Sequence, residues 1–199
     1  MHDTVLEFCK KHLRQDRIAN GDILEVGSMD VNGSIRQHCM KHGPASYTGL
    51  DIAPGPGVDI VADIETYVGP KRYDGVICTE VFEHIRHWWK AVRALSDLVV
   101  DGGWLLLTTR SPGYPVHYYP GDYWRFTVED LQAIFGTWVK DIWTDLVIEK
   151  DIHDVGPGVM MFLNPFDVEA INTKHTIADA VLRRRRVYSI IDGCNVAPS

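Results

Sequence analysis

The stretch Ile23-Leu24-Glu25-Val26-Gly27-Ser28 decides the fold of this 199-residue chain. Its apolar run is typical of a short buried strand, and Gly27 ends that strand in a turn. A helix is expected to begin near Gly33-Ser34. Such a turn places backbone N–H groups around an incoming ligand, and its glycine lets the ligand approach the main chain closely. The stretch from Glu25 through Ser28 to Gly33 therefore predicts a ligand-binding loop.

Glu25 indicates the charge of that ligand. S-adenosylmethionine carries an ammonium and a sulfonium group, and a carboxylate two residues before Gly27 favours binding of such a cation. A dinucleotide presents an anionic pyrophosphate, which an acid at this position disfavours. Moreover, the segment from Gly27 to Gly33 does not fit the Gly-x-Gly-x-x-Gly pattern of dinucleotide sites. S-adenosylmethionine is therefore the expected cofactor, and an NAD-dependent oxidoreductase is the least supported interpretation.

Strands and helices alternate along the rest of the chain. Further strands are expected over residues 46–51, 58–63, 73–78, 104–109, 143–148 and 159–163. Helices are expected over about 4–15, from near 88 to 99, after Thr127 and over about 173–190. This alternation predicts an α/β fold with a mostly parallel sheet and helices on both faces. The length and the 45% hydrophobic content indicate a single domain over residues 1–199.

Two acids close the second and third expected strands. Asp51 stands where a βαβ unit places the acid that binds ribose hydroxyls, with Ile52 beside it. Asp63 is positioned to accept a hydrogen bond from the adenine amino group, while Ile64 packs on the ring. The alternative is that both acids only cap turns.

These residues, in this order, resemble the class I methyltransferases. The resemblance rests on Ile23 to Gly27, Gly33-Ser34, Asp51, Asp63-Ile64 and the string Cys78-Thr79-Glu80-Val81-Phe82-Glu83-His84. It covers roughly residues 20–165, and it implies a Rossmann-like seven-stranded sheet whose last strand is antiparallel. It further implies a cofactor bound along the carboxyl ends of the early strands, with Thr79 and Glu80 among its contacts. The loop departs from the commonest family form, because Met29 and Val31 occupy later glycine positions.

Candidate catalytic residues follow the fourth expected strand. Glu80, Glu83 and His84 come at the carboxyl edge of the sheet, where ligands bind in such folds. His84 is the first choice for a general base that removes a proton from an acceptor hydroxyl, with Glu83 and His117 as further candidates. The alternative is a structural helix start whose imidazole bonds to the backbone.

Glu-x-x-Glu-His also resembles the magnesium-binding stretch of small-RNA 2'-O-methyltransferases and of ubiquinone-pathway O-methyltransferases. Carboxylate oxygens suit that ion, and His117 or Asp122 would supply a further ligand from the insertion described next. Because Glu-His after this strand is common in relatives without metal, the sequence favours no metal.

The segment Tyr114 to Phe126 interrupts the strand-helix pattern and is rich in aromatic residues and proline. With residues from about 110 it is expected to form an insertion that covers the acceptor, since tyrosine and tryptophan faces stack on sugars or bases. The alternative is a packed flap with Trp124 and Phe126 in the core. The string Tyr-Pro-x-Asp-Tyr-Trp-Arg-Phe-Thr over residues 119–127 resembles bacterial and phage methyltransferases often associated with glycan or sugar-linked acceptors. Residues expected to bind the acceptor are Tyr118, Asp122, Trp124 and Arg125.

Composition narrows the function classes. The formal charge of -7 and pI near 5.7 oppose a broad duplex nucleic-acid surface. The chain shows no signal-peptide pattern and no run of about 20 apolar residues, so a cytoplasmic enzyme without membrane contact is expected. Four scattered cysteines indicate neither a zinc site nor a disulfide framework. The run Arg183 to Arg186 is interpreted as a solvated helix face, with a phosphate contact as the alternative.

The leading hypothesis is an S-adenosylmethionine-dependent O-methyltransferase that acts on a small-molecule or sugar-bearing acceptor. An RNA or nucleotide methyltransferase is the second enzyme hypothesis, favoured by the Glu-x-x-Glu-His string and the run Arg183 to Arg186 and opposed by the acidic charge. A catalytically silent cofactor-binding module that regulates a partner is the hypothesis from another class.

Overall fold

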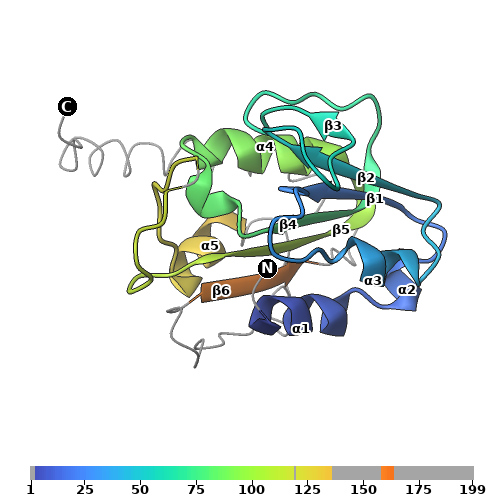
Figure 1. Ribbon diagram of the computed structural model, residues 1–199, viewed down its shortest axis with the longest axis horizontal. Helices are drawn as coiled ribbons and strands as arrows, with labels where there is room; N and C mark the ends of the chain where they lie inside the picture. The colour runs from blue at the N-terminus through green and yellow to red at the C-terminus, as the bar shows by residue number, and fades with distance from the viewer. Residues whose placement is uncertain (1–2, 119, 136–157, 164–199) are drawn as a thin grey trace.

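The computed structural model describes residues 3–118, 120–135 and 158–163, and Figure 1 shows them as a sheet with helices on both sides. The described strands form one sheet in the order β3-β2-β1-β4-β5-β6. Neighbours from β3 to β5 pair in parallel, and β6 runs antiparallel to β5. The strand bounds are Asp22–Val26 (β1), Ser46–Asp51 (β2), Ile60–Val61 (β3), Tyr73–Thr79 (β4), Val99–Arg110 (β5) and Gly158–Leu163 (β6). The expected α/β class with a mostly parallel sheet is confirmed.

Some expected elements differ in extent. The third strand is shorter than expected, because the chain turns at Asp63, whose carbonyl accepts the N–H groups of Thr66 and Tyr67. β5 begins at Val99, five residues earlier than expected. Residues 143–148 and 173–190, expected to be a strand and a helix, lie outside the described residues, so the seventh strand stays a prediction.

Helices precede or connect the strands. Their bounds are Asp3–His12 (α1), Gln15–Ile18 (α2), Arg36–Met40 (α3), Trp88–Leu98 (α4) and Val128–Phe135 (α5), with a 3-10 turn η1 at Phe82–His84. α3 begins later than the expected start near Gly33, because the Asp30 carboxylate accepts the Gly33 N–H at 2.9 Å and keeps the loop irregular. No helix within the described segments has the length and apolar character needed to cross a bilayer.

Two apolar cores lie on the two faces of the sheet. Leu24 and Val26 of β1 point into a core shared with α4, η1 and α5. Ile23 points to the opposite face, into a core with α1 and α3. Because side chains alternate along a strand, Glu25 lies on the same face as Ile23. The Glu25 side chain therefore lies on the face of the sheet that α1 and α3 cover.

The turn after β1 requires glycine. Gly27 has a φ of +76°, and a Cβ added there would lie 2.0 Å from Cγ2 of Val81, which follows β4. The close approach brings the loop after β1 against the loop after β4. The carboxyl ends of the central strands therefore meet at one edge of the sheet.

Candidate active site

A cavity of about 270 Å³ opens at this edge of the sheet. It joins the loop after β1 to the residues that follow β4 and β5. Its lining residues are Glu25, Gly27, Ser28, Met29, Val31, Asn32, Gly33, Ser34, Thr79, Glu80, His84, Arg110, Tyr114 and His117. The structure therefore brings the expected cofactor loop and the expected catalytic histidines to one cavity.

Glu25 is the buried acid of this cavity, with 2% of its surface exposed. The Tyr47 hydroxyl, on β2, donates a hydrogen bond of 2.8 Å to Glu25 Oε2. Burial raises the pKa of Glu25 to about 7, against the hydrogen bond from Tyr47 and the charge of Arg36, which lower it. Because this pKa lies near neutral, a cation bound nearby would favour the ionised form of Glu25.

The acids after β2 and β3 lie outside the lining of this cavity. The two Asp51 oxygens accept the N–H groups of Met29 and Ala53, each at 3.1 Å, so Asp51 ties the cofactor loop to the end of β2. Asp63 is exposed and accepts the Glu65 N–H at 2.8 Å.

The two neighbouring isoleucines differ in burial. Ile64 is buried in the core on the α4 side, whereas Ile52 is 57% exposed. The nucleoside contacts expected of Ile52, Ile64 and the two acids stay predictions.

Glu80 follows β4 in a left-handed conformation, with a φ of +57°. Its N–H donates to the Thr108 carbonyl at 3.0 Å, and the Thr108 hydroxyl donates to Glu80 Oε1 at 2.8 Å. Arg110, at the end of β5, pairs with the other Glu80 oxygen. Glu80 is therefore fixed by β5 on both sides of its carboxylate.

Arg110 itself is nearly buried, with 4% of its surface exposed, and it lines the cavity. Its guanidinium carbon lies 4.1 Å from the centre of the Tyr114 ring, and its Nε lies 3.8 Å from Glu83 Oε1. The site therefore holds a fixed cation between two carboxylates. The sequence placed Tyr114 in the aromatic insertion without giving it a contact of its own. Arg110 was missed, and its one signal is its place at the end of a strand.

Glu83 lies in a cluster with His84 and His117 and is fully buried. The Thr109 hydroxyl donates to its Oε2 at 2.8 Å, while its Oε1 has no hydrogen-bond partner. Burial, reinforced by the charge of Glu80, raises the pKa of Glu83 above its usual range. An unsatisfied buried carboxylate oxygen is costly, so its orientation toward the cluster suggests a ligand there.

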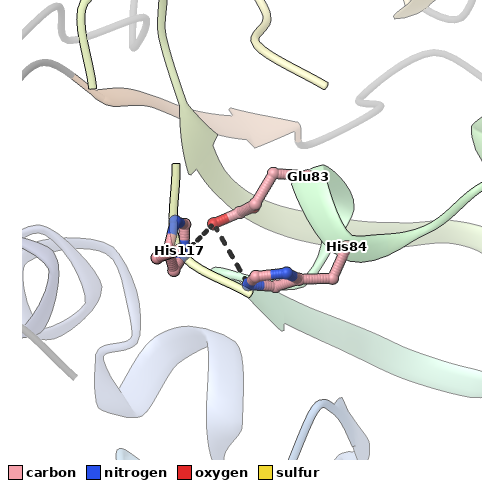
Figure 2. A group of neighbouring side chains, drawn as sticks. All are labelled: Glu83, His84 and His117. Atoms are coloured by element: carbon pink, nitrogen blue, oxygen red, sulfur yellow. Dashed lines mark ion pairs between the residues drawn. The ribbon is translucent and has the colours of Figure 1, made fainter. Parts of the chain in front are cut away.

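Two histidines face Glu83 from different segments, as Figure 2 shows. Glu83 Oε1 lies 3.9 Å from His84 Nε2 and 4.0 Å from His117 Nε2. The imidazole rings meet edge to face, with their centres 4.8 Å apart. One ligand atom from each of the three residues lies within 4.8 Å of the others, which suits a metal ion.

The hydrogen bonds of the histidines set which nitrogen is free. His84 Nδ1 contacts the Gly121 carbonyl, and because a carbonyl only accepts, Nδ1 carries the proton. The Nε2 of neutral His84 is thus unprotonated and faces the cluster. The backbone N–H of His117 donates to Asp122 Oδ2 at 2.7 Å, and the ring Nδ1 of His117 lies 3.1 Å from the same oxygen. Partial burial and the neighbouring His84 lower the pKa of His117.

The aromatic insertion is held by an internal ion pair. Arg125 pairs with both oxygens of Asp122 and donates to the carbonyls of Tyr114 and Pro115 at 3.2 and 2.9 Å. Although partial burial opposes it, the hydrogen bonds from Arg125 and His117 hold the pKa of Asp122 at about 2. Arg125 and Asp122 thus shape the segment that carries His117, and a contact of either with the acceptor stays a prediction.

The same segment is docked onto η1 and β5. The N–H groups of Tyr123 and Trp124 donate to the Glu83 carbonyl at 2.9 and 3.3 Å, and the Trp124 indole donates to the Arg86 carbonyl at 3.2 Å. Phe126 is buried in the core, as the packed-flap alternative expected. Tyr118, by contrast, is 79% exposed. The insertion is therefore anchored at its carboxyl end, with Tyr118 projecting outward.

A family model described as a methyltransferase domain matches residues 3–140. The chain belongs to this family. The ubiquinone biosynthesis O-methyltransferase of Nitrosospira multiformis is 30% identical over 112 residues, 48% of this chain and 46% of that protein. That of Chromobacterium violaceum is 31% identical over 121 residues, 52% of this chain and 49% of that protein. The methyltransferase chain thus spans about half the length of the curated relatives it matches.

Solved methyltransferase structures share the fold. The 1,6-didemethyltoxoflavin-N1-methyltransferase of Burkholderia thailandensis, with bound 1,6-didemethyltoxoflavin and S-adenosylhomocysteine, has a TM-score of 0.61 at 13% identity, covering 83% of this chain and 82% of its own. The magnesium protoporphyrin IX methyltransferase of Synechocystis PCC 6803, with bound S-adenosylmethionine, has a TM-score of 0.56 at 16% identity, covering 81% of this chain and 78% of its own. The expected Rossmann-like methyltransferase fold is confirmed.

Proposed function

We propose that this protein transfers the methyl group of S-adenosylmethionine to a hydroxyl group of a small-molecule acceptor. The observation that carries the proposal is one cavity whose lining includes Glu25, the loop after β1, His84 and His117, the two histidines that cluster with Glu83. The curated relatives are named O-methyltransferases, which supports oxygen as the methylated atom. The solved neighbours with bound S-adenosylmethionine or S-adenosylhomocysteine support the choice of cofactor.

The cofactor binds with its amino-acid end at Glu25. The Glu25 carboxylate attracts the ammonium group, while the N–H groups of the loop through Ser28 and Gly33 surround the ligand. Thr79, Glu80 and His84 line the part of the same cavity that would lie beside the reactive methyl group, which the cofactor would supply when bound. Asp51, at the carboxyl end of β2, reaches the ribose hydroxyls beyond the cavity.

His84 acts as the general base in this proposal. Its Nε2 takes the proton of the acceptor hydroxyl as the oxygen attacks the methyl carbon, and the bond between carbon and sulfur breaks to leave S-adenosylhomocysteine. Placing acceptor and donor in line contributes up to ~7 to 11 kcal/mol, and a positioned base adds about 10² to 10⁴ in rate. His117, held by Asp122, is the alternative base on the other side of the cluster.

The same cluster also fits a divalent metal ion. Glu83 Oε1 is buried without a hydrogen-bond partner and points at both imidazoles, so Glu83, His84 and His117 would hold the ion. When bound, such an ion lowers the pKa of the acceptor hydroxyl directly. Glu80, a further ligand in the magnesium-binding resemblance, is instead paired with Arg110. Two imidazoles and one carboxylate suit a transition metal better than magnesium.

The acceptor class is tested by a panel assay. The protein is incubated with methyl-labelled S-adenosylmethionine and, separately, phenols, glycans, nucleotides and RNA, and the labelled atom is located by mass spectrometry and NMR. The expected result is a labelled methyl group on an oxygen atom of a small molecule, which includes sugar-bearing molecules. Label on RNA would support the second enzyme hypothesis, and label on nitrogen would overturn O-methylation. Cofactor binding without any transfer would favour a regulatory module.

A further inference from the structure

Tyr47 is a half-buried partner of Glu25, a role that its position in the sequence does not reveal. Its hydroxyl donates to Glu25 Oε2 at 2.8 Å, across the pairing of β1 with β2. Glu25 is paired with Gly49, two residues after Tyr47, so the two side chains lie on the same face of the sheet. Glu25 lines the cavity, whereas Tyr47 lies outside its lining.

Arg36 of α3 fixes the tyrosine in place. Its guanidinium lies 5.2 Å from the centre of the Tyr47 ring and donates to the Tyr47 carbonyl at 3.3 Å. The same guanidinium donates to the Gly57 carbonyl and to Asp59 Oδ2, each at 2.9 Å. The ring is therefore clamped against the sheet, and its hydroxyl is aimed at Glu25 before a ligand arrives.

The other ionisable groups around Glu25 do not orient its carboxylate as the Tyr47 hydroxyl does. Cys9 of α1 and Cys39 of α3 flank it, and burial raises the pKa of both thiols, so they stay neutral. The charge of Arg36 favours ionised Glu25, whereas the charges of Asp30 and Asp51 oppose it. Arg36 bonds to Tyr47, Gly57 and Asp59 and acts on Glu25 through space. The hydrogen bond that stabilises the Glu25 carboxylate comes from Tyr47.

We propose that Tyr47 is a positioning residue for cofactor binding, whose hydroxyl orients the Glu25 carboxylate and favours its ionised form for the ammonium group of S-adenosylmethionine. The proposal rests on the proposed function, because it requires that ligand in this cavity. It assigns to Tyr47 no contact with the cofactor. The effect of Tyr47 is transmitted entirely through Glu25.

The direction of the pH dependence follows from the hydrogen bond. Glu25 is protonated below a pH of about 7 and must lose that proton to face an ammonium group, so affinity rises as the pH passes through that value. Tyr47→Phe removes a hydrogen bond that lowers the pKa of Glu25, so the rise moves to higher pH. Each unit of that displacement weakens binding about tenfold on the acidic side, while the two proteins converge on the alkaline side.

Calorimetric titration with S-adenosylhomocysteine between pH 6 and 9 tests the proposal. For a displacement of about one unit, the ratio of wild-type to Tyr47→Phe affinity is expected to be about eightfold at pH 6.5 and to shrink toward one at pH 9. The ligand's own titration cancels in that ratio. Tyr67→Phe is the matched control, because Tyr67 loses the same hydroxyl from a half-buried ring outside the cavity lining, and it is expected to leave the affinity unchanged.

Two further arms separate positioning from loss of structure. In a Glu25→Gln background, Tyr47→Phe is expected to add little, since its effect acts through the carboxylate. Methylthioadenosine, which has the nucleoside without the ammonium group, is expected to bind wild type and Tyr47→Phe equally. Equal affinities for S-adenosylhomocysteine at every pH, or a loss that is constant with pH and persists with methylthioadenosine, would overturn the role of Tyr47. Failure of the wild type to bind any of these ligands would instead overturn the proposed function.

Discussion

Replacing His84 by alanine removes a hydrogen bond and, on this account, the general base. The lost Nδ1 contact to the Gly121 carbonyl is worth about 0.5 to 1.5 kcal/mol of stability. Loss of the base lowers turnover by about 10² to 10⁴, which raises the barrier by about 2.7 to 5.4 kcal/mol. Because domains of this kind are stable by about 5 to 15 kcal/mol, His84→Ala stays folded, and the two effects are measurable separately.

The assay is single-turnover methyl transfer to the acceptor that the panel identifies, normalised to folded protein and accompanied by calorimetry of the cofactor. His87→Ala is the matched control: His87 Nδ1 contacts Glu65 Oε2 at 2.7 Å and does not line the cavity, so turnover should hold while stability falls slightly. In His84→Ala, turnover is expected to collapse while cofactor affinity is kept. EDTA should change nothing in the wild type.

A metal-bound cluster gives a different pattern. EDTA then silences the wild type, a divalent ion restores it, and Glu83→Ala and His117→Ala are nearly as damaging as the change at His84. Near-normal turnover in His84→Ala without chelator sensitivity would refute both roles and leave catalysis to positioning or to His117.

Three further predictions follow from the same geometry. Gly27→Ala should lower the free energy of unfolding, measured in urea, by about 1 to 3 kcal/mol, because φ at Gly27 is +76° and the added Cβ would lie 2.0 Å from Val81. Adding Val81→Ala should relieve the clash but leave the backbone strain. The unliganded wild type should lose stability relative to Glu25→Gln as pH rises from about 4.5 to about 7, because burial raises the pKa of Glu25. A difference in melting temperature between the two proteins that stays constant over this range would contradict the prediction. Tyr118→Ala, a change at a 79% exposed side chain, should weaken acceptor binding, measured as KM, and spare cofactor affinity; loss of cofactor binding in the folded variant would place Tyr118 in the cofactor pocket.

The parts that sequence predicted well are local. The apolar run into Gly27 specified β1 and its turn, because burial pattern and backbone freedom are properties of consecutive residues. The placement of Glu83 and His84 after β4 also followed from their neighbours in the chain. These features need no knowledge of what packs against them.

The parts that sequence missed depend on residues far apart in the chain. Arg110 pairs with Glu80 across β4 and β5, and Tyr47 reaches Glu25 across β1 and β2, so strand order and register decide both contacts. Whether His117 meets Glu83 likewise depends on how the insertion docks. The sequence shows which residues are present, but the packing of distant segments determines which of them line the same cavity.

Calorimetric titration of the unliganded protein with S-adenosylhomocysteine and, separately, with NAD tests the central claim most directly. The cavity beside Glu25 predicts binding of one S-adenosylhomocysteine per chain, no binding of NAD, and weaker S-adenosylhomocysteine binding in Glu25→Gln. Binding of NAD together with failure to bind either S-adenosylmethionine or S-adenosylhomocysteine would contradict the account.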